Sequence, residues 1–316
     1  MAARSGIAAQ LMFAEEVTVG TGVTPTLTLP IVSETLEFTR EDIQSDAIMP
    51  GRGVATSGQL TTGNGIVSGG VQGELYAKGG VGTLFKHAFG SVTTTGSNPY
   101  SHDFRLSDTY GKGLTIQKGV PGVGGTVRPL TYSGCKISEL AIGFEQGKIV
   151  TFGFDIMGMS ATKATALASP DGSTVGNPFK FSHCTLSLGG SAQSVISGEF
   201  KLSTPLRARH FLGTATSAEP IVNGLREASA QFKIEWTDFT YYDLFTGGTE
   251  AAVSWVATNG TETLTITGNG WFDANSPKVS GRDVVEQDLP VRFTASTSND
   301  YSAFRAVLTG STESTV

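Results

Sequence analysis

Cysteine is scarce in this sequence, and no metal-binding or redox motif surrounds it. The 316-residue chain has two cysteines, Cys135 and Cys184, and neither belongs to a CxxC pair. Nothing in their spacing implies a disulfide framework. We therefore expect both to be small apolar core residues of a protein made and folded in a cytoplasm.

Charged residues are also few, at 16% of the chain, and their balance is acidic, with a net charge of −6. A protein that grips nucleic acid needs clustered Lys and Arg against the phosphates. The composition therefore disfavours nucleic-acid binding, although it allows nucleic acid to pass nearby. Low charge also suits a protein whose surface is covered by neighbouring subunits, since interface cores are depleted of charge.

Long apolar runs and a secretory leader are missing. No run approaches the roughly 20 residues of a membrane-spanning helix. The nearest stretch to a leader, "GIAAQLMFAEEV", has no basic flank and is interrupted by Glu15 and Glu16. We expect no membrane partner.

Residue patterns that support catalysis are missing as well. The four histidines form no HxxxH or HxH pair, and the chain has no GxSxG motif. The stretch "GVPGVGGTV" resembles a phosphate loop only in its glycines, because no Gly-Lys-Ser/Thr follows and another strand does. We expect no catalytic residue, no metal and no cofactor, and hence no enzyme.

What the chain does have is glycine, with 41 residues, and many short alternating segments. In "ETLEFTRED", Leu36 and Phe38 fall on one face and their neighbours on the other, as in a half-buried strand. The segments "CKISELAIGFE" and "IVTFGFDIMG" read as a long hairpin across "QGK". These patterns predict an all-β fold with short helices.

One sequence pattern, a strand followed by a short helix, occurs twice. "VSGGVQGELYAKGGVGTLFKHAFG" and "EASAQFKIEWTDFTYYDLFTGG" each place a strand before a short amphipathic helix that ends at glycine, with Asp238 as the predicted N-cap of the second. Leu84-Phe85 corresponds to Leu244-Phe245. The chain is therefore predicted to consist of the following parts: an arm at 1–33, a first domain at 34–160, a linker at 161–178 and a second domain at 179–316.

A long extension, residues 40–66, interrupts the first domain. A loop of this length is uncommon unless it is functional or disordered, and this one has too few charges for a solvated tether. We interpret it as a hairpin extension that docks on a partner. Its charged residues are better suited to interface ion pairs than to acid–base chemistry: Arg40, Glu41, Asp42, Asp46 and Arg52.

The N-terminal region resembles a known family. "GIAAQLMFAEEVTVGTGVTPTLTLPIVSETLEFTREDIQSDAIMPGR" is similar to the opening of major tail tube proteins of long, non-contractile-tailed bacteriophages of siphovirus type. The matching positions are Gly6–Glu16, Gly20–Pro25, Ser33–Leu36, Arg40 and Arg52. Later segments, "YYDLFTGG" and "VEQDLPVRFTAS", fit the same family, so the resemblance covers nearly the whole chain.

The resemblance implies two tandem tail-tube-type β-sandwich or barrel domains, each with one flanking helix. Sheets of neighbouring subunits would join edge to edge around a channel, and rings would stack into a tube with the 40–66 extension as the ring-stacking loop. If each half is one tube domain, three chains make a ring of six similar domains; if only one half is, six chains are needed. We favour the trimer.

The resemblance further implies that double-stranded DNA slides through the channel without specific binding. An acidic wall would serve this purpose, and our candidate lumen acids are Glu139, Glu145 and Asp288. The implied partners are the protein itself and other tail proteins, such as tape measure, terminator and distal tail proteins. The implied location is the virion tail, after assembly in the host bacterial cytoplasm.

Other readings of the sequence predict different features. A secreted β-sandwich adhesin or carbohydrate-binding module should have a secretion signal and an aromatic platform, but Trp236, Trp255 and Trp271 are not clustered in sequence. A tube protein of a secretion or contractile system generally holds a single copy of the domain. A glycosidase would need one essential acidic pair.

Overall fold

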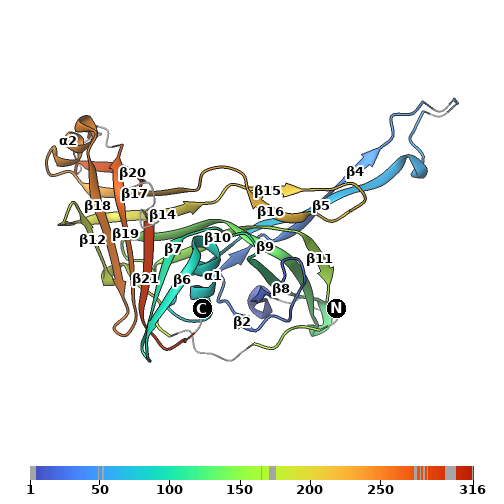
Figure 1. The fold of residues 1–316 in the computed structure, drawn as a ribbon, viewed down its shortest axis with the longest axis horizontal. Helices are drawn as coiled ribbons and strands as arrows, with labels where there is room; N and C mark the ends of the chain where they lie inside the picture. The colour runs from blue at the N-terminus through green and yellow to red at the C-terminus, as the bar shows by residue number, and fades with distance from the viewer. Residues whose placement is uncertain are drawn as a thin grey trace.

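β-Strands make up most of the molecule, and the helices are short (Figure 1). The computed structural model describes residues 5–48, 50–51, 53–164, 166–170, 176–273, 276–277, 279, 282, 284–295, 304–314 and 316. In this part of the chain the α-helices are α1 (Val81–Phe89) and α2 (Thr240–Gly247). The predicted all-β class with short helices is confirmed, and the strand pairings form open sheets rather than a closed barrel.

The first half of the chain, residues 5–164, forms two sheets that share one long strand. Its strands are β1 (Gln10–Glu16), β2 (Leu27–Thr28), β3 (Ser33–Glu34), β4 (Glu37–Gln44), β5 (Leu60–Glu74), β6 (Gly90–Gly96), β7 (Tyr100–Leu106), β8 (Gly113–Pro121), β9 (Val127–Glu145), β10 (Thr151–Gly158) and β11 (Ser160–Lys163). The order β4–β5–β10–β9 forms what we call the inner sheet, with β3 also on β5, and β2–β1–β8–β9–β11 forms the outer sheet. Strand β9 belongs to both sheets because its two ends pair with different neighbours.

The second half, residues 176–316, also has an inner and an outer sheet. Its strands are β12 (Cys184–Leu188), β13 (Ser191–Gln193), β14 (Val195–Ser203), β15 (Leu206–Arg209), β16 (Ala218–Val222), β17 (Glu227–Glu235), β18 (Glu250–Thr258), β19 (Thr263–Phe272), β20 (Glu286–Phe293) and β21 (Phe304–Ser311). The inner sheet has the order β14–β17–β20, and the outer sheet has β13–β12–β18–β19–β21. Strands β15 and β16 form a separate hairpin.

Strand pairing repeats between the two halves. The pairs β1–β2, β1–β8, β8–β9, β9–β11, β9–β10, β10–β5 and β5–β4 are matched by β12–β13, β12–β18, β18–β19, β19–β21, β19–β20, β20–β17 and β17–β14. Helix α1 follows β5, and α2 follows β17. Glu74 and Glu235 end these strands, and Leu84 and Leu244 are equivalent in the helices, so the connection is one residue shorter in the second half. The domain limits 34–160, 161–178 and 179–316 stay a prediction.

Two strand pairings join the halves. The C-terminal part of β9 pairs with β14 from Glu139↔Ser203 to Glu145↔Ser197, and this makes one continuous inner sheet. The β6–β7 hairpin lies between α1 and β8, and β7 extends the outer sheet of the second half by pairing with β21. The second half has no counterpart of this hairpin, because β18 begins shortly after α2.

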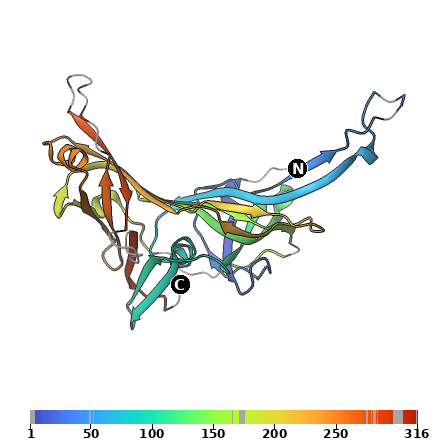
Figure 2. The same cartoon turned by 45° about the horizontal axis from the view of Figure 1, so that its top comes forward.

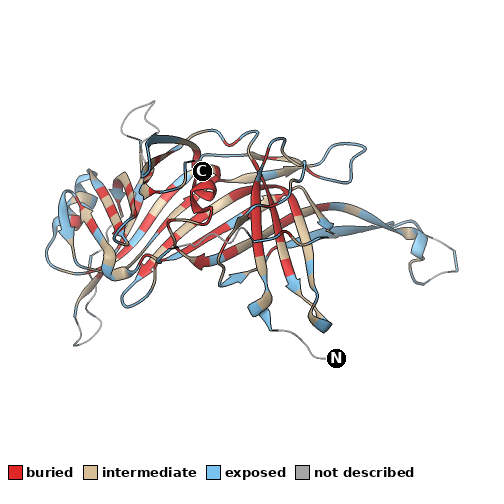
Figure 3. Ribbon diagram, turned by 90° about the horizontal axis from the view of Figure 1, so that it is seen from below, coloured by how far each residue is buried: buried red, intermediate tan, exposed pale blue. Residues whose placement is uncertain are grey.

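Aromatic side chains fill the space between the sheets. Buried positions alternate with less buried ones along the strands (Figure 3). Phe89 of α1 stacks on Phe304 of β21, with ring centroids 5.5 Å apart. Phe144 of β9 stacks on Trp255 of β18 at 5.4 Å. Because both contacts join a residue of the first half to one of the second, the two halves share one core. Burial of each such side chain stabilises the fold by about 1.5–3 kcal/mol.

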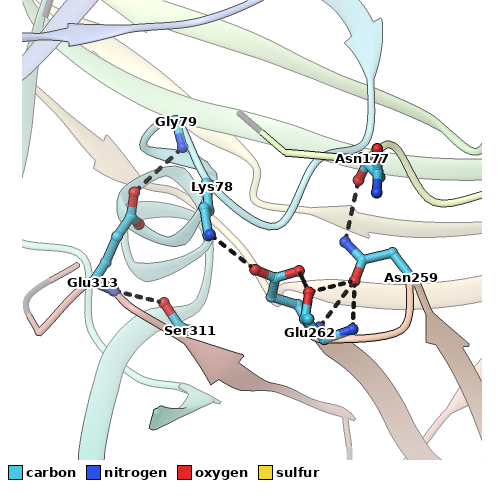
Figure 4. A network of polar contacts seen from close by, with 8 residues as sticks. Lys78, Gly79, Asn177, Asn259, Glu262, Ser311 and Glu313 are labelled. Atoms are coloured by element: carbon cyan, nitrogen blue, oxygen red, sulfur yellow. Dashed lines mark hydrogen bonds and ion pairs between the residues drawn. The ribbon is translucent and has the colours of Figure 1, made fainter. Parts of the chain in front are cut away.

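Polar contacts also tie the halves together (Figure 4). Lys78, just before α1, forms an ion pair of 3.1 Å with the buried Glu262 of the second half. Asn259 accepts from the Glu262 main-chain N–H and donates through Nδ2 to the Asn177 oxygen. Burial raises the pKa of Glu262, but hydrogen bonds from Thr261, Lys78 and Asn259 outweigh it, and the pKa is lowered overall. Asn259 thus has a structural role in the turn between β18 and β19.

Two local expectations differ from the structure. Residues 10–16, expected within an extended N-terminal arm, form β1, whose Leu11, Met12 and Phe13 are buried against the core. The N-cap of α2 is Phe239 rather than Asp238. The Asp238 carboxylate still accepts the main-chain N–H of Thr240 at 2.9 Å, so it stabilises the helix start from one position further out.

Candidate assembly surfaces

The inner sheet has one apolar face and one solvent face. On β9, Leu140, Ile142 and Phe144 are buried in the core, so the odd-numbered residues between them face away from it. The pairing of β5, β10, β14, β17 and β20 keeps the same alternation in register across all six strands. Side chains that are far apart in sequence therefore share this solvent face.

The solvent face of the inner sheet is acidic. Its acidic residues are Glu74, Glu139, Glu145, Asp155, Glu199, Glu227, Glu235, Glu286 and Asp288, and its basic strand residues are Lys201, Lys233 and Arg292. Each base lies beside a carboxylate: Lys201 is 2.7 Å from Glu139, Lys233 pairs with Glu286, and Arg292 is 3.5 Å from Asp273. The face therefore carries a net negative charge.

All three acids predicted from the sequence for a channel wall lie on this face. Glu139 and Glu145 are on β9, and Asp288 is on β20. Asp155 lies opposite Glu139; burial and the negative charge of Glu139 raise the pKa of Asp155 above its ordinary value, although Lys201 opposes this. That the face lines a channel stays a prediction.

A hollow of about 380 Å³ also lies on this face. Both signs of charge line it, with Glu145, Glu199 and Asp288 beside Lys148 and Lys233. Within the described ranges, no group of three or more His, Cys, Asp or Glu residues is arranged to hold a metal ion.

A two-stranded arm, β4–β5, projects from the end of the inner sheet (Figures 1 and 2). Both ends of the predicted 40–66 extension, residues 40–44 and 60–66, are thus strand residues of β4 and β5. Every residue of β4 is exposed. The arm also exposes large apolar side chains: Phe38, Ile43, Ile48, Val54 and Leu60. A free two-stranded ribbon is marginally stable in water, so this arm is suited to contact a partner.

The predicted charged residues of the arm behave differently from one another. Arg40 and Asp42 form an exposed ion pair of 3.0 Å. Glu41 and Asp46 are exposed, and Arg52 lies outside the described residues. A partner role for any of them stays a prediction.

Helix α2 presents a third surface, made of aromatic side chains. Phe239 and Phe245 are exposed, and Tyr242 contacts both rings edge-on or tilted. Trp271 of β19 is also partly exposed, and it lies against Gly248 at the end of the helix. The sequence predicts a helix that flanks the sheets, but its pattern does not predict this exposed aromatic surface.

The acidic pair of the N-terminal motif serves the fold. Glu15 binds Nε2 of the buried His87 at 2.9 Å and Lys86 at 2.8 Å, and the His87 hydrogen bond is the main reason that its pKa falls to about 2. The buried Glu16 accepts hydrogen bonds from Gly20 N–H, Thr115 Oγ1 and Gly134 N–H at 2.6–2.8 Å. These residues attach β1 to α1, β8 and β9.

The two thiols are poorly suited to chemistry. Cys135 is fully buried, and burial raises its pKa. Burial likewise raises the pKa of Cys184 to about 12. Because the thiolate is the reactive form, both residues stay inert near neutral pH.

Comparison with known proteins identifies one family. A family model described as phage tail tube protein matches residues 6–295 of the chain. No curated protein matches it. None of the helices in the described residues is long and apolar enough to span a membrane.

Proposed function

Because the chain belongs to the phage tail tube protein family, we propose that it assembles into stacked rings whose channel carries phage DNA into the host. The match spans most of the chain, so a structural role in the virion tail applies to the protein as a whole. We propose that the tube belongs to a long, non-contractile tail of siphovirus type and that the subunit has no catalytic activity.

We propose a ring of three chains in which each chain supplies two of six similar units. The observation that carries this proposal is the repeated strand pairing, in which β14–β17–β20 matches β4–β5–β10. The β9–β14 pairing joins two units in register inside one chain. Among the described residues, β4 pairs on one side only, and a ring would cover that edge, which otherwise invites uncontrolled pairing.

We propose that the acidic solvent face of the inner sheet is the channel wall. DNA carries about one negative charge per 1.7 Å, and proteins that hold it do so with Lys and Arg on the phosphates. On this face the three strand cations lie beside carboxylates, as described above. The wall would therefore repel DNA at distances within the Debye length of about 8–10 Å, and DNA could slide without adhering.

We propose that the arm makes the contact from ring to ring. Its apolar side chains Ile43, Ile48, Val54 and Leu60 are exposed in the single chain, and burial in an adjacent ring would remove them from water. Beyond self-contacts, the proposal includes tape measure, terminator and distal tail proteins as partners and assembly in the host cytoplasm.

Electron microscopy of purified protein tests this function. We expect rings or tubes, and a symmetry-resolved cross-section should contain six similar units from three chains, with a ring mass of three times 33.0 kDa. A ring mass corresponding to six chains would contradict the trimer. Monomers under all assembly conditions would contradict the tube role itself.

A further inference from the structure

The two helices occupy corresponding positions but are covered to different extents. In α1 every residue except Lys86 is buried, whereas in α2 only Tyr241 is. Phe85 and Phe245 are equivalent, yet Phe85 is 2% exposed and Phe245 is 38% exposed. Within the single chain, α1 is thus buried by other elements, whereas α2 is largely exposed to solvent.

The second half of the chain covers α1. Phe85 and Phe89 of α1 line a small internal cavity together with Phe200 and Leu202 of β14 and Phe304 of β21. Arg226, which directly precedes β17, donates to the main-chain oxygen of Phe89 at 2.9 Å. The cover of α1 therefore includes β14, β21 and the arginine before β17 from the second half, in addition to the β6–β7 hairpin of its own half, whose Phe104 ring lies 5.5 Å from that of Phe85.

The first half has a strand equivalent to β14, and in the described part of the single chain this strand packs against no helix. Strand β4 corresponds to β14. Phe38 lies opposite Val67 and Leu202 lies opposite Ala228, and Val67 and Ala228 are equally far from the ends of β5 and β17. Phe38 is therefore equivalent to Leu202, but Phe38 is 45% exposed whereas Leu202 is 2% exposed.

The residue of the first half that is equivalent to Arg226 is Gly65. Gly65 occupies on β5 the place that Arg226 occupies before β17, and the ring of Phe38 lies directly over it: a Cβ at Gly65 would come within 2.1 Å of that ring. Helix α2 also has less need of an arginine cap. Its last carbonyls accept main-chain hydrogen bonds, from Thr249 to Leu244 at 3.0 Å and from Gly248 to Phe245 at 3.2 Å.

We propose that α2 of one chain packs against β4 of the next chain in the ring, so that Phe245 contacts Phe38 of the neighbouring subunit. This contact repeats between chains the arrangement of Phe85 and Leu202 inside the chain. The inference rests on the proposed ring and adds to it the two surfaces that meet. The partner is a second copy of this chain.

The position of the two surfaces suits such a contact. Helix α2 and strand β4 lie at opposite ends of the molecule (Figure 1), so they cannot meet within one chain. A contact between different surfaces of identical subunits is head-to-tail, and it closes into a ring when the rotation allows. Exposed aromatic side chains are also the residues most often found as energetic centres of interfaces.

Photo-crosslinking tests the proposed contact directly. Phe38 is replaced by p-benzoylphenylalanine, and the assembled protein is irradiated and digested. We expect interchain crosslinks to the peptide that contains residues 239–248, and none from dilute monomer. Rings that crosslink only elsewhere, for example to residues 206–222, would overturn this inference and leave the ring proposal intact. Failure to form rings with the unmodified protein would instead overturn the ring proposal.

Aspartate variants provide a second test. Phe38→Asp and Phe245→Asp should keep the melting temperature of the parent, because both side chains are exposed in the single chain. Each should reduce ring formation by about tenfold or more. Val17→Asp, at an exposed apolar residue outside both surfaces, is the control and should assemble normally.

A mixture of the two variants makes the test directional. Phe38→Asp chains keep an intact α2 surface, and Phe245→Asp chains keep an intact β4 surface. One intact junction then forms between unlike chains, and we expect heterodimers but no closed rings of three. Normal rings from the mixture or from either variant alone would overturn the inference.

Discussion

The guanidinium of Arg226 donates a hydrogen bond of 2.9 Å to the main-chain oxygen of Phe89, and so the second half of the chain caps the helix of the first. The same guanidinium donates to the oxygens of Ser107 and Ala88. Burial lowers the pKa of Arg226 to about 10, so the side chain keeps its charge at neutral pH. One residue therefore satisfies three carbonyl groups at the junction of the halves.

Replacement of this arginine should destabilise the fold. Arg226→Ala removes the arginine donor from the Ala88 and Ser107 carbonyls, whereas the Phe89 carbonyl keeps the Ser107 N–H at 2.8 Å. We expect a loss of about 2–3 kcal/mol in the free energy of unfolding. Arg226→Lys should recover part of the loss, because an ammonium supplies charge but not the planar set of donors. Urea unfolding of both variants measures this. A loss below about 0.5 kcal/mol for Arg226→Ala would contradict the role assigned to Arg226.

The contact between Glu15 and His87 predicts that the stability of the fold decreases at acidic pH. The pKa of Glu15 is lowered to about 2 in the fold and is about 4.3 in an unfolded chain. Its stabilising contribution is therefore complete above the unfolded value and is lost as the pH falls from about 4.3 to about 2. Because the carboxylate is partly exposed, solvent screening reduces the contribution to about 1 kcal/mol.

Chemical denaturation of the parent and of Glu15→Gln at several pH values measures this contribution. The parent should be more stable at pH 7, and the difference should disappear near pH 2. A difference that persists unchanged at pH 2 would show that the contact does not depend on the charge of Glu15.

Reversal of charge on the acidic face should make assembled tubes bind DNA. We expect Glu199→Lys combined with Asp288→Lys to give binding that weakens with added salt, since each new phosphate contact releases counterions. The neutral pair Glu199→Gln and Asp288→Asn is the matched control and should bind little. Fluorescence anisotropy with labelled duplex DNA measures the effect. Equal, weak binding by all three tubes would argue that this face does not line the channel.

Shortening of the arm should separate ring formation from tube growth. Gln44 pairs with Leu60, so residues 45–59 can be replaced by an Asn-Gly turn that closes the hairpin. We expect folded protein that still forms rings, because the loop lies beyond the sheet junctions, but rings that do not stack. Light scattering and electron microscopy measure stacking. Normal tubes from this variant would contradict the proposed role of the arm in the ring-to-ring contact.

Local features of the fold were largely predictable from the sequence. The helix that stops at Gly90 and the long hairpin across "QGK" follow from period and turn chemistry. The β1 strand was not recognised, because Leu11, Met12 and Phe13 are consecutive apolar residues without alternation. A strand buried on both faces has no period-2 signal.

The contacts between distant segments were less predictable. Alternation within β9 assigns Glu139 and Glu145 to the same face, but only the pairing with β14, β17 and β20 brings Glu199 and Asp288 beside them. The exposure of Phe245 reflects two differences between the halves: β18 follows α2 without a hairpin like β6–β7, and no described strand covers α2 as β14 covers α1. Such differences arise from tertiary packing, which the pattern of one segment does not specify.

The β9–β14 pairing has a consequence for how rings come together. Two units on one polypeptide meet at an effective concentration set by their tether rather than by the amount of protein in solution. In the proposed ring of three chains, half of the junctions would therefore be complete once each chain has folded. Closure of that ring would need three encounters between chains instead of six, and dilution would weaken only the three junctions between chains.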